Sequence, residues 1–245
     1  NVLSVQSDRA GNLWLGLDNG IDYVEISAPF YRILPDGDLE GPGYAAQVFG
    51  NSLYLGTSNG LYQIPWKKYY NPFENKPFSL VQGTTGQVWG LNVLDKALLL
   101  GHHEGAFEVQ VDRALPLDSR IGTWKFVALN DSIRIAGQYD GLSVLRRTKA
   151  GSWRWLGKLP GLTESCRILV VEKDSILWIS HPYRGVFRVA FKKGLERPDT
   201  RLFGVTEGLP SRLFNYVYKI GNRPLVSGEQ GLFRFDPAGG RFVAA

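Results

Sequence analysis

The sequence has little of what many catalytic and metal sites need. Its 245 residues include one cysteine, three histidines and no methionine. A single cysteine allows no internal disulfide, and Cys166 lies in an expected strand, where we predict a buried thiol rather than a nucleophile. The sequence also has no glycine-rich phosphate loop and no nucleophile elbow. These absences argue against nucleotide-dependent and serine-hydrolase chemistry.

Long apolar runs and helical patterns are missing as well. No run approaches the roughly 18 apolar residues of a membrane-spanning helix. No secretory signal opens the sequence, and residues 2–5 already form an expected strand. We therefore expect a soluble segment cut from a longer protein.

Charge is present but is not gathered in one place. The net charge is +5 and the pI is about 9.3. Lys and Arg occur as scattered pairs at 67–68, 146–147 and 192–193. A nucleic-acid footprint needs a clustered basic surface, so we expect these pairs at solvated strand edges and expect no nucleic-acid partner.

What the sequence does contain is one pattern repeated six times. A short apolar run leads into a polar turn that closes on a glycine, and a second run with alternating apolar residues follows. Each copy is a predicted β-hairpin, because glycine adopts the positive φ that tight reversals need. The closing glycines are 36 to 46 residues apart, close to the length of a propeller blade. They are Gly20, Gly60, Gly105, Gly141, Gly185 and Gly231.

Another short strand precedes each hairpin and a fourth follows most of them, as at residues 31–33 and 153–155. The fold class is therefore all-β. We predict one domain over residues 1–245, a β-propeller of four-stranded antiparallel blades with about six blades visible. Either the ring closes with these six blades, or the blades belong to a seven-bladed ring. Residues 65–73 form an expected insertion.

The first copy resembles a known family. Residues 8–16, with the sequence DRAGNLWLG, are followed by Asn19, Gly20 and Ile21. They look like the two-component regulator propeller repeat, whose pattern is D-x-x-G-N-[LI]-W-[LI]-G-T-x-x-G-[LI]. Leu17 stands where the family usually has threonine. Residues 86–89, 164–167 and 208–210 resemble later blades of bacterial periplasmic sensors of this kind, so the resemblance covers essentially the whole chain.

The resemblance implies the extracytoplasmic, ligand-sensing propeller of an inner-membrane regulator, either a hybrid histidine kinase or a related one-component transcriptional regulator. Such a propeller lies in the periplasm, and many members respond to oligosaccharides released from polysaccharides. The resemblance also implies contact with a neighbouring propeller or immunoglobulin-like domain, and a homodimer in the full-length protein. Kinase and DNA-binding activity are not expected of this segment, because it contains no output module.

Blade topology sorts the loops onto two faces. The turns between second and third strands share one face with the joins between blades, and all three histidines fall there. We expect the ligand on this face, with aromatic rings stacking on sugars and arginines meeting carboxylate or sulfate groups. The candidate ligand-binding residues are Trp89, His102, His103, Tyr139, Arg167, His181, Tyr183 and Arg184. The opposite face carries ordinary turn formers, namely Asp8, Arg9, Asn51, Asn130 and Asn222.

Other interpretations stay open. Polar turns are ordinary, so the same face could be a scaffold that docks a neighbouring domain or a second subunit. By position, four tryptophans are typical of packing between blades: Trp14, Trp89, Trp124 and Trp178.

Catalysis and metal binding are weaker alternatives. We expect no metal at His102, His103 and His181, because adjacent histidines on a turn diverge and no acidic or cysteine partner completes a ligand spacing. A glycan hydrolase or lyase would need paired carboxylates on neighbouring blades. The candidates are Glu104, Asp140, Glu164 and Glu229. We expect no cofactor and no enzymatic activity.

Overall fold

The computed structural model describes residues 1–26, 33–39, 41–67, 78–118, 121–150, 153–192 and 194–245. The chain divides into two compact units, residues 1–34 with 69–76 and residues 35–68 with 77–245. Within the described ranges the regular structure is β, apart from two short 3-10 helices, η1 (Gly37–Leu39) and η2 (Lys173–Ser175). No helix in those ranges is long and apolar enough to cross a membrane.

The first unit holds a three-stranded antiparallel sheet. Its consecutive strands are β1 (Val2–Ser7), β2 (Leu13–Leu17) and β3 (Gly20–Val24). Of the fourth strand expected at 31–33, residues 31 and 32 lie outside the described residues. Within this sheet the ring of Trp14 lies 4.8 Å from that of Tyr23.

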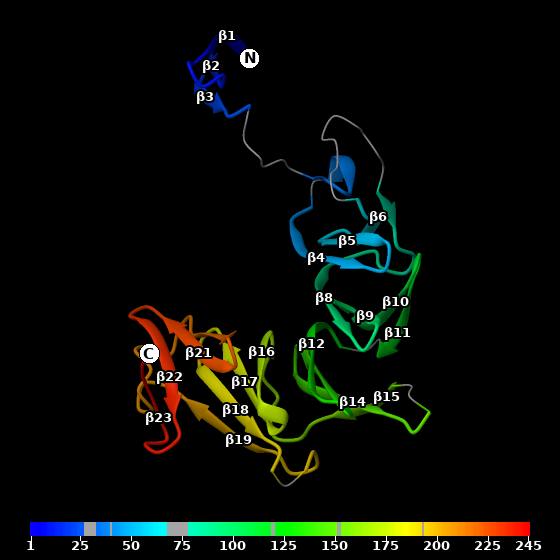
Figure 1. Ribbon diagram of the computed structural model, residues 1–245, viewed down its shortest axis with the longest axis vertical. Coiled ribbons are helices and arrows are strands. Elements are labelled where there is room, and N and C mark those ends of the chain that lie inside the picture. Colours follow the sequence, from blue (N-terminus) through cyan, green and yellow to red (C-terminus); the bar gives the residue numbers. More distant parts are fainter. Residues whose placement is uncertain (27–32, 40, 68–77, 119–120, 151–152, 193) are drawn as a thin grey trace. The chain divides into compact units, whose positions relative to one another are not determined.

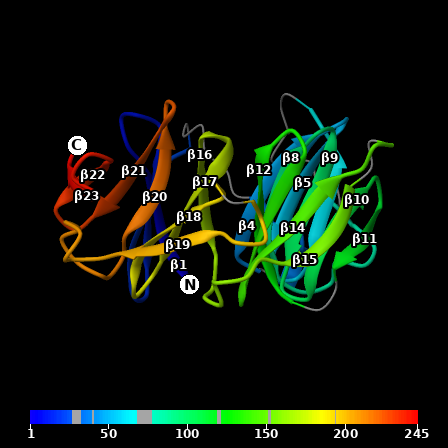
Figure 2. The ribbon, with the colours of Figure 1, turned by 90° about the horizontal axis from the view of Figure 1, so that it is seen from below.

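The second unit contains five four-stranded antiparallel sheets, each built from consecutive strands (Figure 1 and Figure 2). The expected insertion at 65–73 lies outside the described residues from position 68 onward. The strands are β4 (Gly43–Phe49), β5 (Ser52–Thr57), β6 (Leu61–Pro65), β7 (Ser79–Leu80), β8 (Val88–Leu94), β9 (Ala97–His102), β10 (Gly105–Gln110), β11 (Arg113–Asp118), β12 (Thr123–Asn130), β13 (Ile133–Gln138), β14 (Gly141–Arg147), β15 (Trp153–Lys158), β16 (Ile168–Glu172), β17 (Ile176–His181), β18 (Gly185–Ala190), β19 (Asp199–Phe203), β20 (Tyr216–Ile220), β21 (Arg223–Gly228), β22 (Gly231–Asp236) and β23 (Arg241–Ala244).

The predicted hairpins form, but their turns differ in length. The β13–β14 turn pairs Gln138 with Gly141, whereas the β17–β18 turn pairs His181 with Gly185 and so holds one extra residue. Gly185 has a φ of +106°, and a Cβ there would lie 2.2 Å from the carbonyl oxygen of Phe203. Glycine alone meets both demands, because other residues rarely adopt this φ and a side chain would collide with the neighbouring strand.

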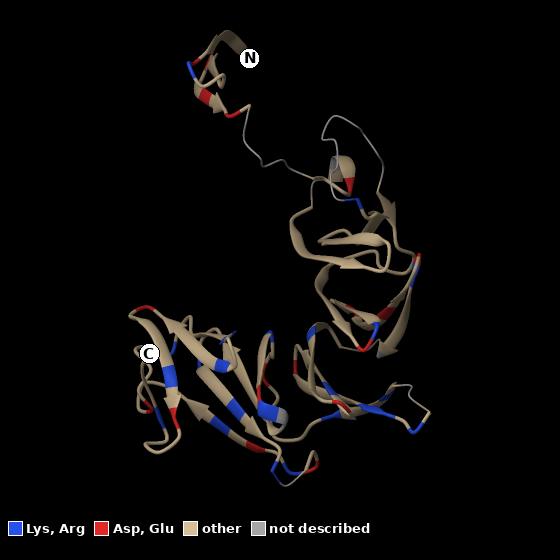
Figure 3. Ribbon diagram, in the orientation of Figure 1, with Lys and Arg blue, Asp and Glu red and all other residues tan. Residues whose placement is uncertain are grey.

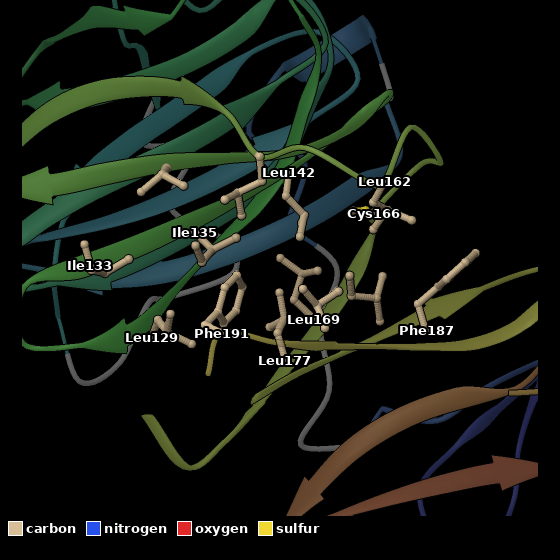
Figure 4. Packing of buried hydrophobic residues seen from close by; sticks show 14 residues of the cluster. Leu129, Ile133, Ile135, Leu142, Leu162, Cys166, Leu169, Leu177, Phe187 and Phe191 are labelled. Atoms are coloured by element: carbon tan, nitrogen blue, oxygen red, sulfur yellow. The ribbon is translucent and has the colours of Figure 1, made fainter. Parts of the chain in front are cut away.

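Buried apolar side chains fill the space between successive sheets. In one cluster, Ile135 and Leu142 of the β12–β15 sheet pack against Leu177 and Phe187 of the β16–β19 sheet (Figure 4). The first strands of successive sheets, β4, β8, β12, β16 and β20, also contact one another. This stacking of antiparallel four-stranded meanders confirms the predicted propeller fold.

Cys166 belongs to the same cluster and is fully buried, as predicted. It lies in the join before β16 and not in a strand, so that part of the prediction is wrong. Burial raises the pKa of its thiol to about 12, which keeps the side chain protonated and unreactive at neutral pH.

Basic side chains are spread over several sheets of the second unit, in agreement with their scatter along the sequence (Figure 3).

Candidate ligand-binding site

Turns and joins share one face, as predicted, and backbone hydrogen bonds tie them together. The N–H of His103, in the β9–β10 turn, donates to the carbonyl of Gln87 in the preceding join at 3.0 Å. In the next sheet the N–H of Tyr139 donates to the carbonyl of Gly122 at the same distance, 3.0 Å. Side chains on these two kinds of loop are therefore held close together.

Four consecutive sheets present a side chain from the same place near the start of their first strand. In β4, β8 and β12, pairing with the second strand skips one residue, namely Tyr44, Trp89 and Trp124. At such a bulge two residues oppose one residue of the partner, which redirects the side chain. In the following sheet β16 begins at Ile168, which matches the residue after the bulge, so Arg167 takes the equivalent position.

These side chains meet in one cluster. The ring centroids of Trp89 and Trp124 are 4.4 Å apart, and Tyr44 meets Trp89 edge to face at 5.3 Å. Tyr139, from the β13–β14 turn, lies 4.8 Å from Trp124. The guanidinium of Arg167 lies 5.0 Å from the Trp124 ring and 5.9 Å from the Trp89 ring, within the range of cation–π attraction.

Hydrogen bonds fix the orientation of both indoles. Trp89 Nε1 donates to Tyr139 Oη at 2.6 Å, and Trp124 Nε1 donates to Ser165 Oγ at 2.9 Å. Behind Tyr139, a Cβ on Gly122 would lie 2.4 Å from the phenol ring, so the ring needs a glycine there. Burial raises the pKa of Tyr139, which therefore stays a neutral phenol.

The cluster borders an open pocket of about 390 Å³. The residues that follow the three bulges also line it, and two of them are small, Ala45 and Gly90. The third is Lys125, whose pKa is lowered by burial. The complete lining is Tyr44, Ala45, Ala46, Trp89, Gly90, Leu91, Asn92, Trp124, Lys125, Arg167 and Ile168. The pocket thus offers aromatic surfaces and two cationic side chains, and its lining includes no carboxylate or imidazole.

Two of the candidate histidines have a role in their own turns. His102 and His181 end β9 and β17, at the position that Gln138 takes in β13. In both, Nδ1 accepts a backbone N–H two residues later, from Glu104 and Tyr183 respectively, at 3.2 Å. Both side chains are buried and neither lines the pocket.

His103 holds the loops together from outside the pocket. Its Nδ1 accepts the N–H of Gln87 at 3.0 Å. The prediction that the adjacent histidines diverge is wrong, because each ring turns back to accept a backbone N–H and the His102 and His103 centroids lie 4.4 Å apart. The described residues nevertheless contain no group of three or more side chains able to hold a metal ion.

The other three candidates form a separate polar group at the β17–β18 turn. Arg184 is ion-paired with Glu164 from the preceding join. His181 Nε2 lies 3.3 Å from the same carboxylate. Tyr183 is largely exposed, and Asp140, another of the carboxylates considered for catalysis, is ion-paired with Lys158. Two of the possible catalytic carboxylates are thus occupied by cations.

The structure therefore brings Trp89, Tyr139 and Arg167 together in the aromatic cluster, where Trp89 and Arg167 line the pocket and Tyr139 lies behind the two indoles. The other candidates lie outside the pocket. Sequence reasoning missed Tyr44 and Lys125, and it assigned Trp124 to packing. A signal was present, because Tyr44, Trp89, Trp124 and Arg167 occupy equivalent places in successive repeats.

No protein-family model matches the chain, and no curated protein matches it by sequence. Solved structures do resemble it. The extracellular domain of BT4673 from B. thetaiotaomicron, described as a one-component system, has a TM-score of 0.65 and 11% identity, and the match covers 100% of this chain and 36% of that structure. The extracellular domain of BT3049 from the same organism, described as a hybrid two-component system, has a TM-score of 0.52 and 16% identity, with 100% and 35% covered. The WD40 β-propeller domain of Doa1 has a TM-score of 0.57 and 13% identity, with 98% and 78% covered.

At these identities the likeness shows the propeller fold. The chain spans about a third of the two bacterial extracellular domains.

Proposed function

We propose that this chain is the ligand-sensing propeller of an extracytoplasmic signal-transduction regulator and that it binds an oligosaccharide in the pocket beside Trp89 and Trp124. The observation that carries the proposal is the row of side chains at equivalent positions of four consecutive sheets, Tyr44, Trp89, Trp124 and Arg167. Flat aromatic surfaces with a few convergent polar groups suit a ligand whose rings have apolar faces and polar rims.

The sensing role is supported by the likeness to extracellular domains of bacterial regulators. A periplasmic location and a neighbouring propeller or immunoglobulin-like domain in the same full-length chain belong to this proposal, as does a homodimer of that chain. Because a fold hosts many functions, the pocket and not the fold carries the ligand assignment.

We propose further that the propeller has no enzymatic activity. Glycoside hydrolysis needs two carboxyl groups flanking the bond, whereas the lining residues include none. Glu164 and Asp140 are ion-paired with Arg184 and Lys158.

Calorimetry against a panel of oligosaccharides, run beside a reducing-end assay for turnover, tests the proposal. We expect one class of oligosaccharide to bind without product formation. Product formation would contradict the non-enzymatic role. If no oligosaccharide of the panel binds, the ligand assignment is contradicted.

A docking role is the second candidate, and exposed apolar side chains favour it. Tyr183 and Phe214 are both more than half exposed, and the N–H of Phe214 donates to the carbonyl of Pro182 at 3.1 Å. Substituting Tyr183 and Phe214 would then impair signalling or dimerisation while oligosaccharide affinity stays constant.

A further inference from the structure

Two cations of the pocket have no acidic partner in the described part of the chain. The guanidinium of Arg167 lies 5.0 Å from the Trp124 ring and 5.9 Å from the Trp89 ring, and no described carboxylate forms an ion pair with it. Glu164, three residues earlier, is ion-paired with Arg184, and Asp140, beside Tyr139, with Lys158. The nearby carboxylates are therefore engaged elsewhere, and the positive charge of Arg167 remains available.

Lys125 is the more unusual of the two. It follows the bulge at Trp124 on the first strand of its sheet, and burial lowers the pKa of its amine. Among the described residues none forms a hydrogen bond or ion pair with that amine. A partly buried ammonium without a counter-charge destabilises the unliganded protein, because water no longer solvates it fully.

The surroundings of Lys125 leave space for a partner. Ala45 and Gly90 hold the equivalent positions in the two preceding sheets and also line the pocket. A Cβ on Gly90 would lie 2.6 Å from the carbonyl oxygen of Trp124 and 3.7 Å from the Cβ of Lys125, so the close approach of β12 allows only a glycine at this corner of the pocket. The small residues keep the pocket open next to the amine.

We propose that Lys125 and Arg167 together bind an anionic group of the saccharide, a carboxylate or a sulfate. This inference rests on the proposed function and narrows its ligand class to acidic sugars. Arg167 matches either group with two parallel N–H donors, and Lys125 supplies a compact charge. Trp89 and Trp124 then carry the ring that bears the anionic group. Ligand binding also supplies the counter-charge that Lys125 lacks in the free protein.

Matched ligand pairs separate charge from shape. The first pair is a galacturonic acid tetrasaccharide and its carboxyl-reduced form, and the second is a heparin-derived tetrasaccharide and its desulfated form. By calorimetry we expect one acidic member to bind at least about tenfold more tightly than its neutral partner, with an affinity that falls as salt rises. A preference in the first pair would identify the bound group as a carboxylate, and a preference in the second pair would identify it as a sulfate. Equal affinity within both pairs would overturn the inference and leave the oligosaccharide proposal standing.

Variants assign the preference to the two cations. Lys125→Met and Arg167→Gln should each reduce the acidic-over-neutral preference about tenfold, with little effect on the neutral partner. Lys158→Met is the matched control, because it removes a cation that is already paired with Asp140. It should leave the preference unchanged. A preference that survives both pocket variants would contradict the inference.

A measurement without saccharide keeps the test independent of the proposed function. Thermal unfolding is recorded in sodium sulfate and in sodium chloride of equal ionic strength. We expect sulfate to stabilise the wild type more than Lys125→Met, because the variant lacks the anion site. Equal stabilisation of both proteins by sulfate would overturn the anion site. If none of the four tetrasaccharides binds but the sulfate effect depends on Lys125, only the oligosaccharide ligand is contradicted.

Discussion

The indole nitrogen of Trp89 donates a hydrogen bond to the hydroxyl oxygen of Tyr139 at 2.6 Å, although 50 residues separate them in the sequence. The bond joins the first strand of one sheet to the β13–β14 turn of the next. It sets the plane of an indole that borders the pocket before any ligand arrives. Such preorganisation favours binding, because less side-chain freedom is lost when the ligand binds.

Tyr139→Phe keeps the aromatic ring and removes the acceptor for the Trp89 indole. We expect saccharide affinity to fall by about 1 kcal/mol, the usual contribution of one hydrogen bond, with a small change in melting temperature. Calorimetry on the wild type and the variant measures this. Tyr23→Phe in the first sheet is the control and should bind as the wild type does. An unchanged affinity for Tyr139→Phe would show that the bond does not prepare the site.

The repeat glycines differ in what surrounds them, and this gives a second prediction. Gly185 and Gly231 have similar φ values of +106° and +117°, but a Cβ on Gly185 would lie 2.2 Å from a carbonyl oxygen, whereas a Cβ on Gly231 would have no atom of the described residues of its unit within 4 Å. Gly231→Ala should cost about 1 kcal/mol for backbone strain alone. Gly185→Ala should cost at least about 2 kcal/mol more in chemical unfolding, because the methyl group also displaces the strand that carries Phe203. Equal losses would show that the close contact is relaxed at no cost.

The buried imidazole of His102 predicts a loss of stability in acid. Burial, and next the charge of His103, lower its pKa below the ordinary value. The folded protein then binds fewer protons than the unfolded chain below about pH 6.5, so the stability that the neutral imidazole provides is complete above that pH and is lost as the pH falls.

His102→Gln places at this position the residue that Gln138 supplies in the next sheet. The free energy of unfolding of this variant should depend less on pH below about 6.5 than that of the wild type, and the two profiles should run parallel above it. If the free energies of unfolding of the two proteins also change in parallel throughout the acid range, the lowered pKa of His102 is contradicted.

A buried guanidinium gives a fourth prediction. Arg134 is 1% exposed, and its Nε donates to Asp95 Oδ2 at 3.1 Å while its Nη2 donates to the carbonyl of Leu94 at 2.8 Å. Asp95→Ala leaves this charge without a counter-ion and should cost about 2 kcal/mol or more in chemical unfolding. Asp112→Ala removes the partner of Arg113 from a pair in which both residues are exposed, and it should cost less than about 0.5 kcal/mol. Similar costs for the two would contradict the buried role of Arg134.

Much of the fold could be predicted from the sequence, because a hairpin is a local structure. The alternating apolar residues and the glycine at each turn are adjacent in the chain, and even the extra residue before Gly185 is visible there. The shared face of turns and joins follows from the up-and-down order of strands. The burial of Cys166 was predictable from its chemistry, although its place in a join was not.

The pocket was predictable only in part. Trp89 and Arg167 were candidates because they lie near turns, whereas the place of Lys125 in the lining depends on the bulge at Trp124, which no local sequence pattern predicts. His102 was a candidate for the same reason as Trp89 and Arg167. Its burial follows from packing between sheets, which a single repeat does not encode.

The affinity of Trp124→Ala for the acidic tetrasaccharides tests the central claim most directly. Trp124 lines the pocket, contacts Trp89, Tyr139 and Arg167, and lies outside the hydrophobic clusters between sheets. Calorimetry should show a loss of about 1 to 3 kcal/mol in the free energy of binding, as expected for a recognition anchor. Asp8→Ala and Asn130→Ala, in turns predicted for the other face, should bind as the wild type does. Equal affinity of the wild type and Trp124→Ala would contradict the account.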